Sequence, residues 1–200
     1  MHIGLTHQPT ALLSVYHKEG IVEFATGLAE AGWRLLASGG TCDTLREAGL
    51  EVGSVGEIVG KPILGHRVVT LSREIFAGIL ATNSEKDQAE MERLGLSYID
   101  LVCVDLYPLE SLRNKPDRTL EEIRELTDIG GPTLLRAAAK GGRIVISMPS
   151  QRQRVLNWIQ AGCPEAEEAK LLHCLAVDAE YLVANYCTIS AELLDGITPE

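Results

Sequence analysis

Two glycine pairs in this sequence stand where a helix is expected to begin, and each is flanked by side chains that could do chemistry. The first pair lies in the segment Ser38-Gly39-Gly40-Thr41, and the second lies in Asp128-Ile129-Gly130-Gly131. Backbone N–H groups in the first turn of a helix have no acceptor within that helix, so they attract phosphates and carboxylates. The two segments therefore indicate a site for an anionic ligand.

The stretch after the second pair has the pattern of a helix with a charge two turns along it. Pro132 suits the first turn, residues 133–140 are good helix formers, and Gly141-Gly142 ends the run. Asp128 would act beside this helix as an acid, a base or a hydrogen-bond acceptor, and Lys140 would supply a fixed positive charge. An ordinary capped helix with a solvated lysine has the same pattern, so both interpretations stay open.

The first pair joins an expected strand to an expected helix. Two glycines let the backbone approach a phosphate closely, and the hydroxyl groups of Ser38 and Thr41 add donors. A tight turn with Thr41 as the helix cap is the alternative. Ser14 and Lys18, which follow the preceding strand, favour a phosphate cradle. The segment lacks the terminal Gly-Lys-Ser/Thr of a P-loop, so a nucleoside triphosphate is not implied.

Further polar side chains follow expected strands or lie in loops. Asp105 and Tyr107 follow the central strand, and the Tyr107 phenol is predicted to point into a cleft beyond the sheet. Arg67 and Thr70 lie in a loop, where the Arg67 guanidinium could bind a phosphate through two hydrogen bonds. A solvated arginine, a tyrosine at the rim of the core and an aspartate that caps a turn are the alternatives. No spacing of His, Cys and Asp suggests a metal site.

The elements that would position these groups alternate between strands and helices. The expected strands are 11–16, 34–37, 51–55, 100–105 and 144–147. The expected helices are 19–31, 42–48, 73–80, 86–94, 119–126, 133–140, 151–161 and 165–186. Residues 61–70 and 110–118 are expected loops. This order predicts an α/β fold with a parallel sheet and helices on both faces, in which ligands bind beyond the carboxyl ends of the strands.

The size and charge of the chain limit its class. Its 200 residues suffice for a substantial core, and we expect a single domain over 1–200. A net charge of −10 argues against binding nucleic acid or an anionic membrane, and no apolar run is long enough to span a bilayer. The five cysteines are spread and contain no CxxC pair, which favours a reducing cytoplasm over a disulfide framework.

The motifs together resemble a known family. The segments 128–131 (Asp-Ile-Gly-Gly) and 136–140 (Arg-Ala-Ala-Ala-Lys) are similar to the signature of the IMP cyclohydrolase domain of the bifunctional purine-biosynthesis enzyme, AICAR transformylase/IMP cyclohydrolase. The other matching segments are 11–20, 38–41, Arg67, 70–71, 78–81 and 106–108. The resemblance implies the three-layer α/β/α fold of methylglyoxal synthase and a chain without the transformylase domain.

The reaction that the resemblance implies is the ring closure of formyl-AICAR to IMP with loss of water, without a metal or other cofactor. Lys140 and Tyr107 would stabilise the oxyanion that develops on the formyl oxygen, and Asp128 would handle or orient the amide. The implied substrate-binding residues are Ser14, Lys18, Ser38, Gly39, Gly40, Thr41, Arg67, Thr70, Asp105, Ile129, Gly130 and Gly131. The implied partners are a purine nucleotide, a second copy in a homodimer and a separate AICAR transformylase.

Several positions depart from the family pattern. Val69 stands where the family has a lysine, and a valine cannot replace that charge. Arg73 could swing in to compensate. The other departures are Ser72, Phe76, Asp105, Tyr16 and His17. They leave open an alternative, a catalytically impaired module of the same fold that binds purine nucleotides or regulates. The histidine- and aspartate-rich site of methylglyoxal synthase is not recognisable here.

Overall fold

A parallel β-sheet forms the centre of the molecule, with the strand order β3-β2-β1-β4-β5. The computed structural model describes residues 7–61, 63–64 and 69–197. Within that part of the chain the strands are β1 Thr10–Val15, β2 Arg34–Ala37, β3 Gly53–Ser54, β4 Leu101–Asp105 and β5 Ile144–Ile146. Neighbouring strands pair in parallel. The central strands β1 and β4 are almost entirely buried and each contains a continuous apolar run, so the sheet must be covered on both faces.

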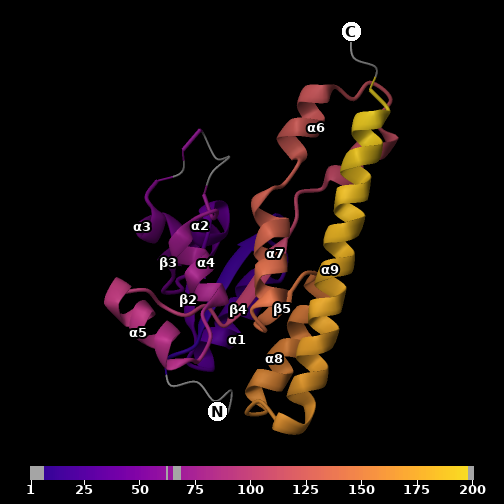
Figure 1. Cartoon of the computed structure of the whole chain (residues 1–200). Helices are drawn as coiled ribbons and strands as arrows, with labels where there is room; N and C mark the ends of the chain where they lie inside the picture. The colour runs from indigo at the N-terminus through magenta and orange to yellow at the C-terminus, as the bar shows by residue number, and fades with distance from the viewer. Residues whose placement is uncertain (1–6, 62, 65–68, 198–200) are drawn as a thin grey trace.

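Helices cover both faces and give a three-layer α/β/α architecture (Figure 1). The α-helices are α1 Ile21–Glu30, α2 Gly39–Glu47, α3 Val55–Val59, α4 Arg73–Leu80, α5 Glu85–Leu94, α6 Leu120–Leu126, α7 Gly130–Lys140, α8 Arg152–Gln160 and α9 Glu165–Asp195. Short 3₁₀ helices, η1 Leu109–Asn114 and η2 Pro149–Gln151, follow β4 and β5. The crossovers through α1 and α7 run in opposite directions across the sheet. Because such crossovers are right-handed, α1 and α7 lie on opposite faces.

The longest helix, α9, runs along one side of the molecule and packs against α7 and the edge strand β5 (Figure 1). Its 31 residues bury a single stripe at helical spacing. The buried residues are Leu171, Leu175, Ala179, Val183, Tyr186, Ile189 and Leu193. In the part of the chain that the structure describes, no helix has both the length and the apolar character needed to cross a membrane.

The carboxyl ends of the strands face one edge of the sheet, and this edge also receives the first turns of α2 and α7. Helix α2 starts two residues after β2. Helix α7 leads back to the beginning of β5, so its first residue, Gly130, lies at the carboxyl edge and its last residue, Lys140, lies toward the opposite edge. The expected site and the expected Lys140 charge are therefore at different ends of one helix.

The predicted parallel α/β architecture is confirmed, and the strand predictions hold to within one residue at each end, apart from one larger shortening. The expected strand 51–55 is reduced to Gly53–Ser54 because Ser54 caps α3. Its hydroxyl accepts from the Gly56 amide, and Glu57 reaches back to the Ser54 amide in a capping box, which turns the chain into a helix.

Several helix boundaries differ from the predicted ones. Both glycine pairs are the first helical residues of α2 and α7 rather than turns that precede them. The expected loop 110–118 overlaps η1, and α9 continues to Asp195 because its buried stripe continues beyond Tyr186. Of the expected loop 61–70, residues 62 and 65–68 lie outside the described residues.

Candidate active site

A cleft with a volume of about 740 Å³ opens at the carboxyl edge of the sheet. It unites segments that are far apart in the sequence, from the end of β1 to the start of α7. The predicted site residues that line it are Ser14, Lys18, Ser38, Gly39, Gly40, Thr41, Thr70, Asp105, Tyr107, Asp128, Ile129, Gly130 and Gly131. Most of the predicted constellation is thus brought to one place.

The remaining predicted residues are Arg67 and Lys140. Arg67 lies outside the described residues. Lys140 is not among the described residues that line the cleft. It ends α7, about 15 Å along the helix axis from Gly130 at the rise of an α-helix. The structure therefore does not bring the Lys140 ammonium to the Tyr107 phenol, and the shared oxyanion role expected for them has no geometric support within one chain.

The first turn of α2 presents unoccupied donors to the cleft. Within the described chain, no protein acceptor bonds the amides of Gly39 and Gly40, whereas the Thr41 amide donates to the Ser38 carbonyl at 3.0 Å. Gly39 has a φ of 42°, a left-handed conformation that favours glycine. Exposed N–H groups at a helix N-terminus suit a phosphate. This end of the cleft can therefore hold the anionic part of a ligand.

Hydroxyl groups fasten that turn to the end of β1. The Ser14 and Ser38 hydroxyls lie 2.6 Å apart. The Thr41 hydroxyl accepts from the Val15 amide and donates to the Val15 carbonyl, both at 3.1 Å, and Thr41 is only 2% exposed. Thr41 is thus held by the protein, so it shapes the cradle, while Ser14 and Ser38 remain half-buried at the cleft wall.

Lys18 places a positive charge beside the same turn. Its ammonium donates to the carbonyls of Val15 and Tyr16. Partial burial lowers the pKa of Lys18, and the nearby Asp105 carboxylate opposes that shift. Asp105 is itself a structural acceptor, because its Oδ2 takes the His17 amide at 2.7 Å. Asp105 therefore holds the loop that carries Lys18.

At the other end of the cleft, the first turn of α7 is already occupied by a carboxylate of the protein. Asp128 Oδ1 accepts from the Gly131 amide at 2.8 Å, and the backbone N–H groups of Tyr107 and Gly130 also favour the charged carboxylate. Burial raises the pKa of Asp128 above its ordinary value, and these N–H groups oppose the increase. Unlike the α2 turn, the α7 turn fixes an acid/base group rather than leaving donors for a ligand.

Gly131 makes this arrangement possible by its size. A Cβ at Gly131 would lie 2.6 Å from Leu106 Cδ2 and would also clash with the Asp128 carboxylate. A Cβ at Gly130 would lie 2.9 Å from the Thr70 hydroxyl. Both glycines therefore allow α7 to approach the strand end and the segment at Thr70 closely, with Asp128 between them.

Tyr107 stands next to Asp128, with a second aromatic ring against it. Burial raises the pKa of the Tyr107 phenol, and the negative charge of Asp128 raises it further, so the phenol stays protonated as a donor. The ring of Tyr16 meets that of Tyr107 edge to face, with centroids 5.4 Å apart. Tyr16 is partly exposed in the cleft. The two rings give this end an aromatic surface suited to a planar group.

The positions that depart from the family pattern have identifiable places. Val69 lines the cleft and packs partly against the core. Ser72 caps α4, because its hydroxyl accepts the Ile75 amide at 3.2 Å, and Phe76 packs against the core. The Arg73 side chain is 79% exposed and pairs with Glu74 at 3.3 Å. The structure therefore does not place Arg73 in the cleft as a substitute for the absent lysine.

Some cleft residues were not predicted. Arg124 and Thr127 line the cleft at the end of α6, and Tyr186 of α9 bonds the backbone beneath Asp128. The signal for Tyr186 was present in the sequence, because a tyrosine within a buried helical stripe must find a partner for its hydroxyl. The partner itself, more than fifty residues earlier in the chain, could not be read from it.

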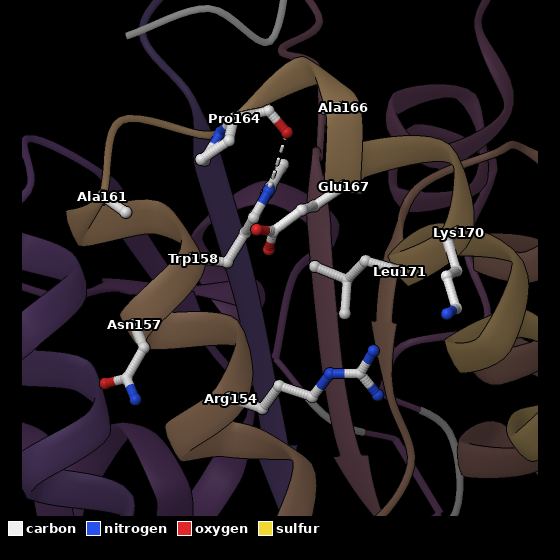
Figure 2. Close-up of a pocket in the computed structure, with 9 residues that line it drawn as sticks. All are labelled: Arg154, Asn157, Trp158, Ala161, Pro164, Ala166, Glu167, Lys170 and Leu171. Atoms are coloured by element: carbon white, nitrogen blue, oxygen red, sulfur yellow. Dashed lines mark hydrogen bonds between the residues drawn. The ribbon is translucent and has the colours of Figure 1, made fainter.

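A second hollow of about 680 Å³ lies at the elbow between α8 and α9 (Figure 2). Trp158 and Leu171 are its buried residues, and the Trp158 indole donates to the Pro164 carbonyl at 3.4 Å. The long side chains of Arg154 and Lys170 stand at its rim (Figure 2). We refer to it below as the elbow hollow.

Comparisons with known proteins agree with the fold. The family model described as "MGS-like domain" matches residues 20–133. The chain is 43% identical over 193 residues to the bifunctional purine biosynthesis protein PurH of Thermosynechococcus vestitus, and 40% identical over 186 residues to that of Oceanobacillus iheyensis. These matches cover 94% and 88% of this chain but only 37% and 36% of the relatives, so the chain spans little more than a third of their length.

A solved structure gives the same result for the fold. The crystal structure of ForH superposes with a TM-score of 0.84 at 36% sequence identity. The superposition covers 94% of this chain and 97% of ForH. The likeness therefore extends over nearly the whole fold of both chains.

Proposed function

The chain belongs to the MGS-like domain family, and from that premise we propose that it is an IMP cyclohydrolase, which closes the pyrimidine ring of formyl-AICAR to give IMP and water. The proposal carries over the purine-biosynthesis role named for the PurH relatives. It treats residues 1–200 as one catalytic domain with a purine nucleotide as its ligand. The proposal includes that the chain forms a homodimer, acts in the cytoplasm and works with a separate AICAR transformylase.

The observation that carries the proposal is the contrast between the two helix N-termini in one cleft. The α2 turn keeps the Gly39 and Gly40 amides without acceptors in the described chain, as a phosphate requires. The α7 turn holds the Asp128 carboxylate with amides, beside a protonated Tyr107 phenol. This arrangement of anion-binding amides at one end of the cleft and acid/base groups at the other fits a ligand with a phosphate at one end and a reacting amide at the other.

Ring closure needs three things that these groups can supply. The carboxamide nitrogen must lie against the formyl carbon, its proton must be accepted, and the charge that develops on the formyl oxygen must be stabilised. Binding of the phosphate at α2 and of the base near Tyr16 would hold the substrate in a reactive conformation. The reaction is intramolecular, so orientation accounts for much of the expected acceleration.

Asp128 and Tyr107 would divide the proton transfers between them. Asp128 would accept the proton of the attacking carboxamide nitrogen as the C–N bond forms. The Tyr107 hydroxyl would donate to the formyl oxygen, which becomes a hydroxyl in the tetrahedral intermediate. Asp128 would then return its proton to that hydroxyl, which leaves as water, and the Tyr107 phenolate would take the proton of the former formamide nitrogen, which completes the C=N bond and restores both groups. The raised pKa of Asp128 favours its work as a base, since a more basic carboxylate accepts a proton more readily.

A specific observation supports a second candidate, a nucleotide-binding module with little or no turnover. Val69 lines the cleft where the resembling family has a lysine, and the exposed Arg73 pairs with Glu74. The cleft therefore has less positive charge near the reacting groups than the family pattern implies. Binding of the nucleotide phosphate would survive, because the α2 turn and Lys18 do not depend on Val69.

A single-turnover experiment distinguishes the candidates. Purified chain in excess over formyl-AICAR should form IMP faster than buffer does, and Tyr107→Phe should lower that rate about 10²- to 10³-fold, as expected when one oxyanion donor is removed. The matched control is Tyr181→Phe, since Tyr181 is 75% exposed on α9 and does not line the cleft. IMP binding without any acceleration would reject the enzyme and leave the binding module.

A further inference from the structure

The backbone that carries Asp128 is held by a residue from the other end of the chain. The Tyr186 hydroxyl accepts from the Asp128 amide at 2.9 Å and donates to the Leu126 carbonyl at 2.9 Å. Tyr186 lies on α9, 58 residues after Asp128. Its hydroxyl thus bridges the last residue of α6 and the residue that carries the reactive carboxylate.

The two bonds use the hydroxyl in complementary ways. A phenol has one proton to donate, and here the Leu126 carbonyl receives it, while the lone pairs accept the Asp128 N–H. Burial raises the pKa of Tyr186 to about 12, so the hydroxyl keeps its proton over the neutral range. Both hydrogen bonds of the Tyr186 hydroxyl therefore persist over the neutral pH range, in which the proposed reaction runs.

Packing alone does not explain the hydroxyl. Tyr186 belongs to the buried stripe of α9, and the other described members of that stripe are the apolar residues Leu, Ala, Val and Ile. A phenylalanine would fill the same space, so what the tyrosine adds is the pair of hydrogen bonds. With Tyr186 only 7% exposed, water has little access to replace them.

The hydrogen bonds of Tyr186 hold the backbone on the N-terminal side of Asp128. The side chain is fixed by the amides that follow it, at Gly130 and Gly131, whereas its own amide and the residues before it are fixed by Tyr186. Between Leu126 and Gly130 the chain is an irregular connection, since α6 has ended and α7 has not begun. Without the hydroxyl, the α6–α7 connection loses these two hydrogen bonds to α9.

We infer that Tyr186 is a positioning residue of the active site, which sets the Asp128 carboxylate through the α6–α7 connection without touching the substrate. The inference rests on the proposed function for its catalytic consequence, but the fastening of the Asp128 backbone stands on the two hydrogen bonds. It makes α9, which lines no part of the cleft in the described chain, a determinant of its chemistry.

The test uses Tyr186→Phe in the full chain, with Tyr181→Phe on the exposed face of the same helix as the matched control. The single-turnover rate at saturating formyl-AICAR should fall about 10- to 100-fold, the range expected when a reacting group is displaced by a fraction of an ångström to one ångström. The dissociation constant for IMP should change less than about twofold, because the α2 turn and Lys18 are untouched. Tyr181→Phe should change neither quantity.

Amide hydrogen exchange gives a readout that does not depend on activity. In Tyr186→Phe the Asp128 amide should exchange faster, while amides in the central strands β1 and β4 keep their protection. A rate and an Asp128 exchange equal to those of the unmutated chain would overturn the inference. Faster exchange throughout the molecule would also overturn it, since Tyr186 would then serve general stability.

Failure of the proposed function is distinguishable from failure of the inference. If the unmutated chain does not form IMP, the cyclohydrolase proposal fails, and the exchange experiment still decides whether Tyr186 holds the Asp128 backbone. Local loss of Asp128 protection supports the positioning role in that case, and unchanged protection rejects it.

Discussion

Two hollows of the molecule have similar volumes but are built from different kinds of chain segment. The cleft at the carboxyl edge measures about 740 Å³ and the elbow hollow about 680 Å³. The cleft is built from residues between Ser14 and Gly131, which come from strand ends, helix starts and loops. The elbow hollow is built from residues between Arg154 and Leu171, which belong to two consecutive helices and their connection (Figure 2).

The two hollows differ in the polar groups that each can present to a ligand. The cleft combines helix amides without protein acceptors in the described chain, a carboxylate with a raised pKa and a phenol with a raised pKa. At the elbow hollow, the Trp158 indole already bonds Pro164, and Arg154 and Lys170 extend from exposed helix surfaces. Volume alone does not make a site, whereas convergent groups held in fixed positions do.

The strongest test of this comparison replaces the carboxylate in the cleft. Asp128→Asn should lower the single-turnover rate about 10²- to 10⁴-fold, because the amide cannot accept the proton of the attacking nitrogen. IMP affinity should change little, since the phosphate is proposed to bind at the α2 turn. Rapid-quench measurement of IMP formation beside calorimetric IMP titration checks both. A variant that keeps the full rate would remove Asp128 from the chemistry.

Stability against pH provides the control for this variant. The folded-state pKa of Asp128 is raised, so its contribution to stability is fully present below the ordinary aspartate pKa and is lost as pH rises through the folded-state pKa. Asp128→Asn lacks this loss, so the variant should gain stability relative to the unmutated protein as pH rises from acid to neutral. Thermal unfolding of both proteins across that range tests it, and a constant difference would contradict the raised pKa.

A smaller effect is expected when the phosphate end of the cleft is altered. Lys18→Met removes the charge beside the Gly40 turn, so affinity for IMP should fall about tenfold or more, as for the loss of one charge-assisted hydrogen bond. Affinity for inosine, which has no phosphate, should stay the same. Titration with both ligands measures the difference, and an equal loss for both would mean that Lys18 acts on the shape of the cleft and not on the phosphate.

The smallest effect is expected at the elbow hollow. Arg154→Ala and Lys170→Ala should leave both the single-turnover rate and IMP affinity within about twofold, since exposed charges far from a site contribute little. The same two assays apply. A loss comparable to that of Lys18→Met would show that size and two cations suffice for a nucleotide site, and the comparison between the hollows would fail.

Much of the fold could be predicted because its signals are local. The continuous apolar residues of β1 and β4 mark buried strands, and alternation with amphipathic helices implies a parallel sheet. The boundaries that differ depend on capping and packing. Ser54 and Glu57 start α3 where a strand was expected to continue, and both glycine pairs are part of the helices that they were expected to precede.

The sequence by itself determined which groups could do chemistry and which edge of the sheet would collect them. The order of strands and helices sends Ser14, Ser38, Asp105 and Asp128 to the carboxyl edge whatever the details of packing. It could not determine how closely α7 approaches Leu106 and Thr70, which leaves no room for a side chain at Gly130 or Gly131.

Helix geometry separates Lys140 from Asp128, whereas tertiary structure alone decides that Tyr186 lies against Asp128. The motif places Lys140 close to Asp128 in sequence, but a helix carries it away by a fixed rise per residue. Tyr186 is distant in sequence, but the packing of α9 on α7 places its hydroxyl on the Asp128 backbone. A helix places residues that are close in sequence far apart along its axis, whereas tertiary packing brings residues from remote parts of the chain into contact.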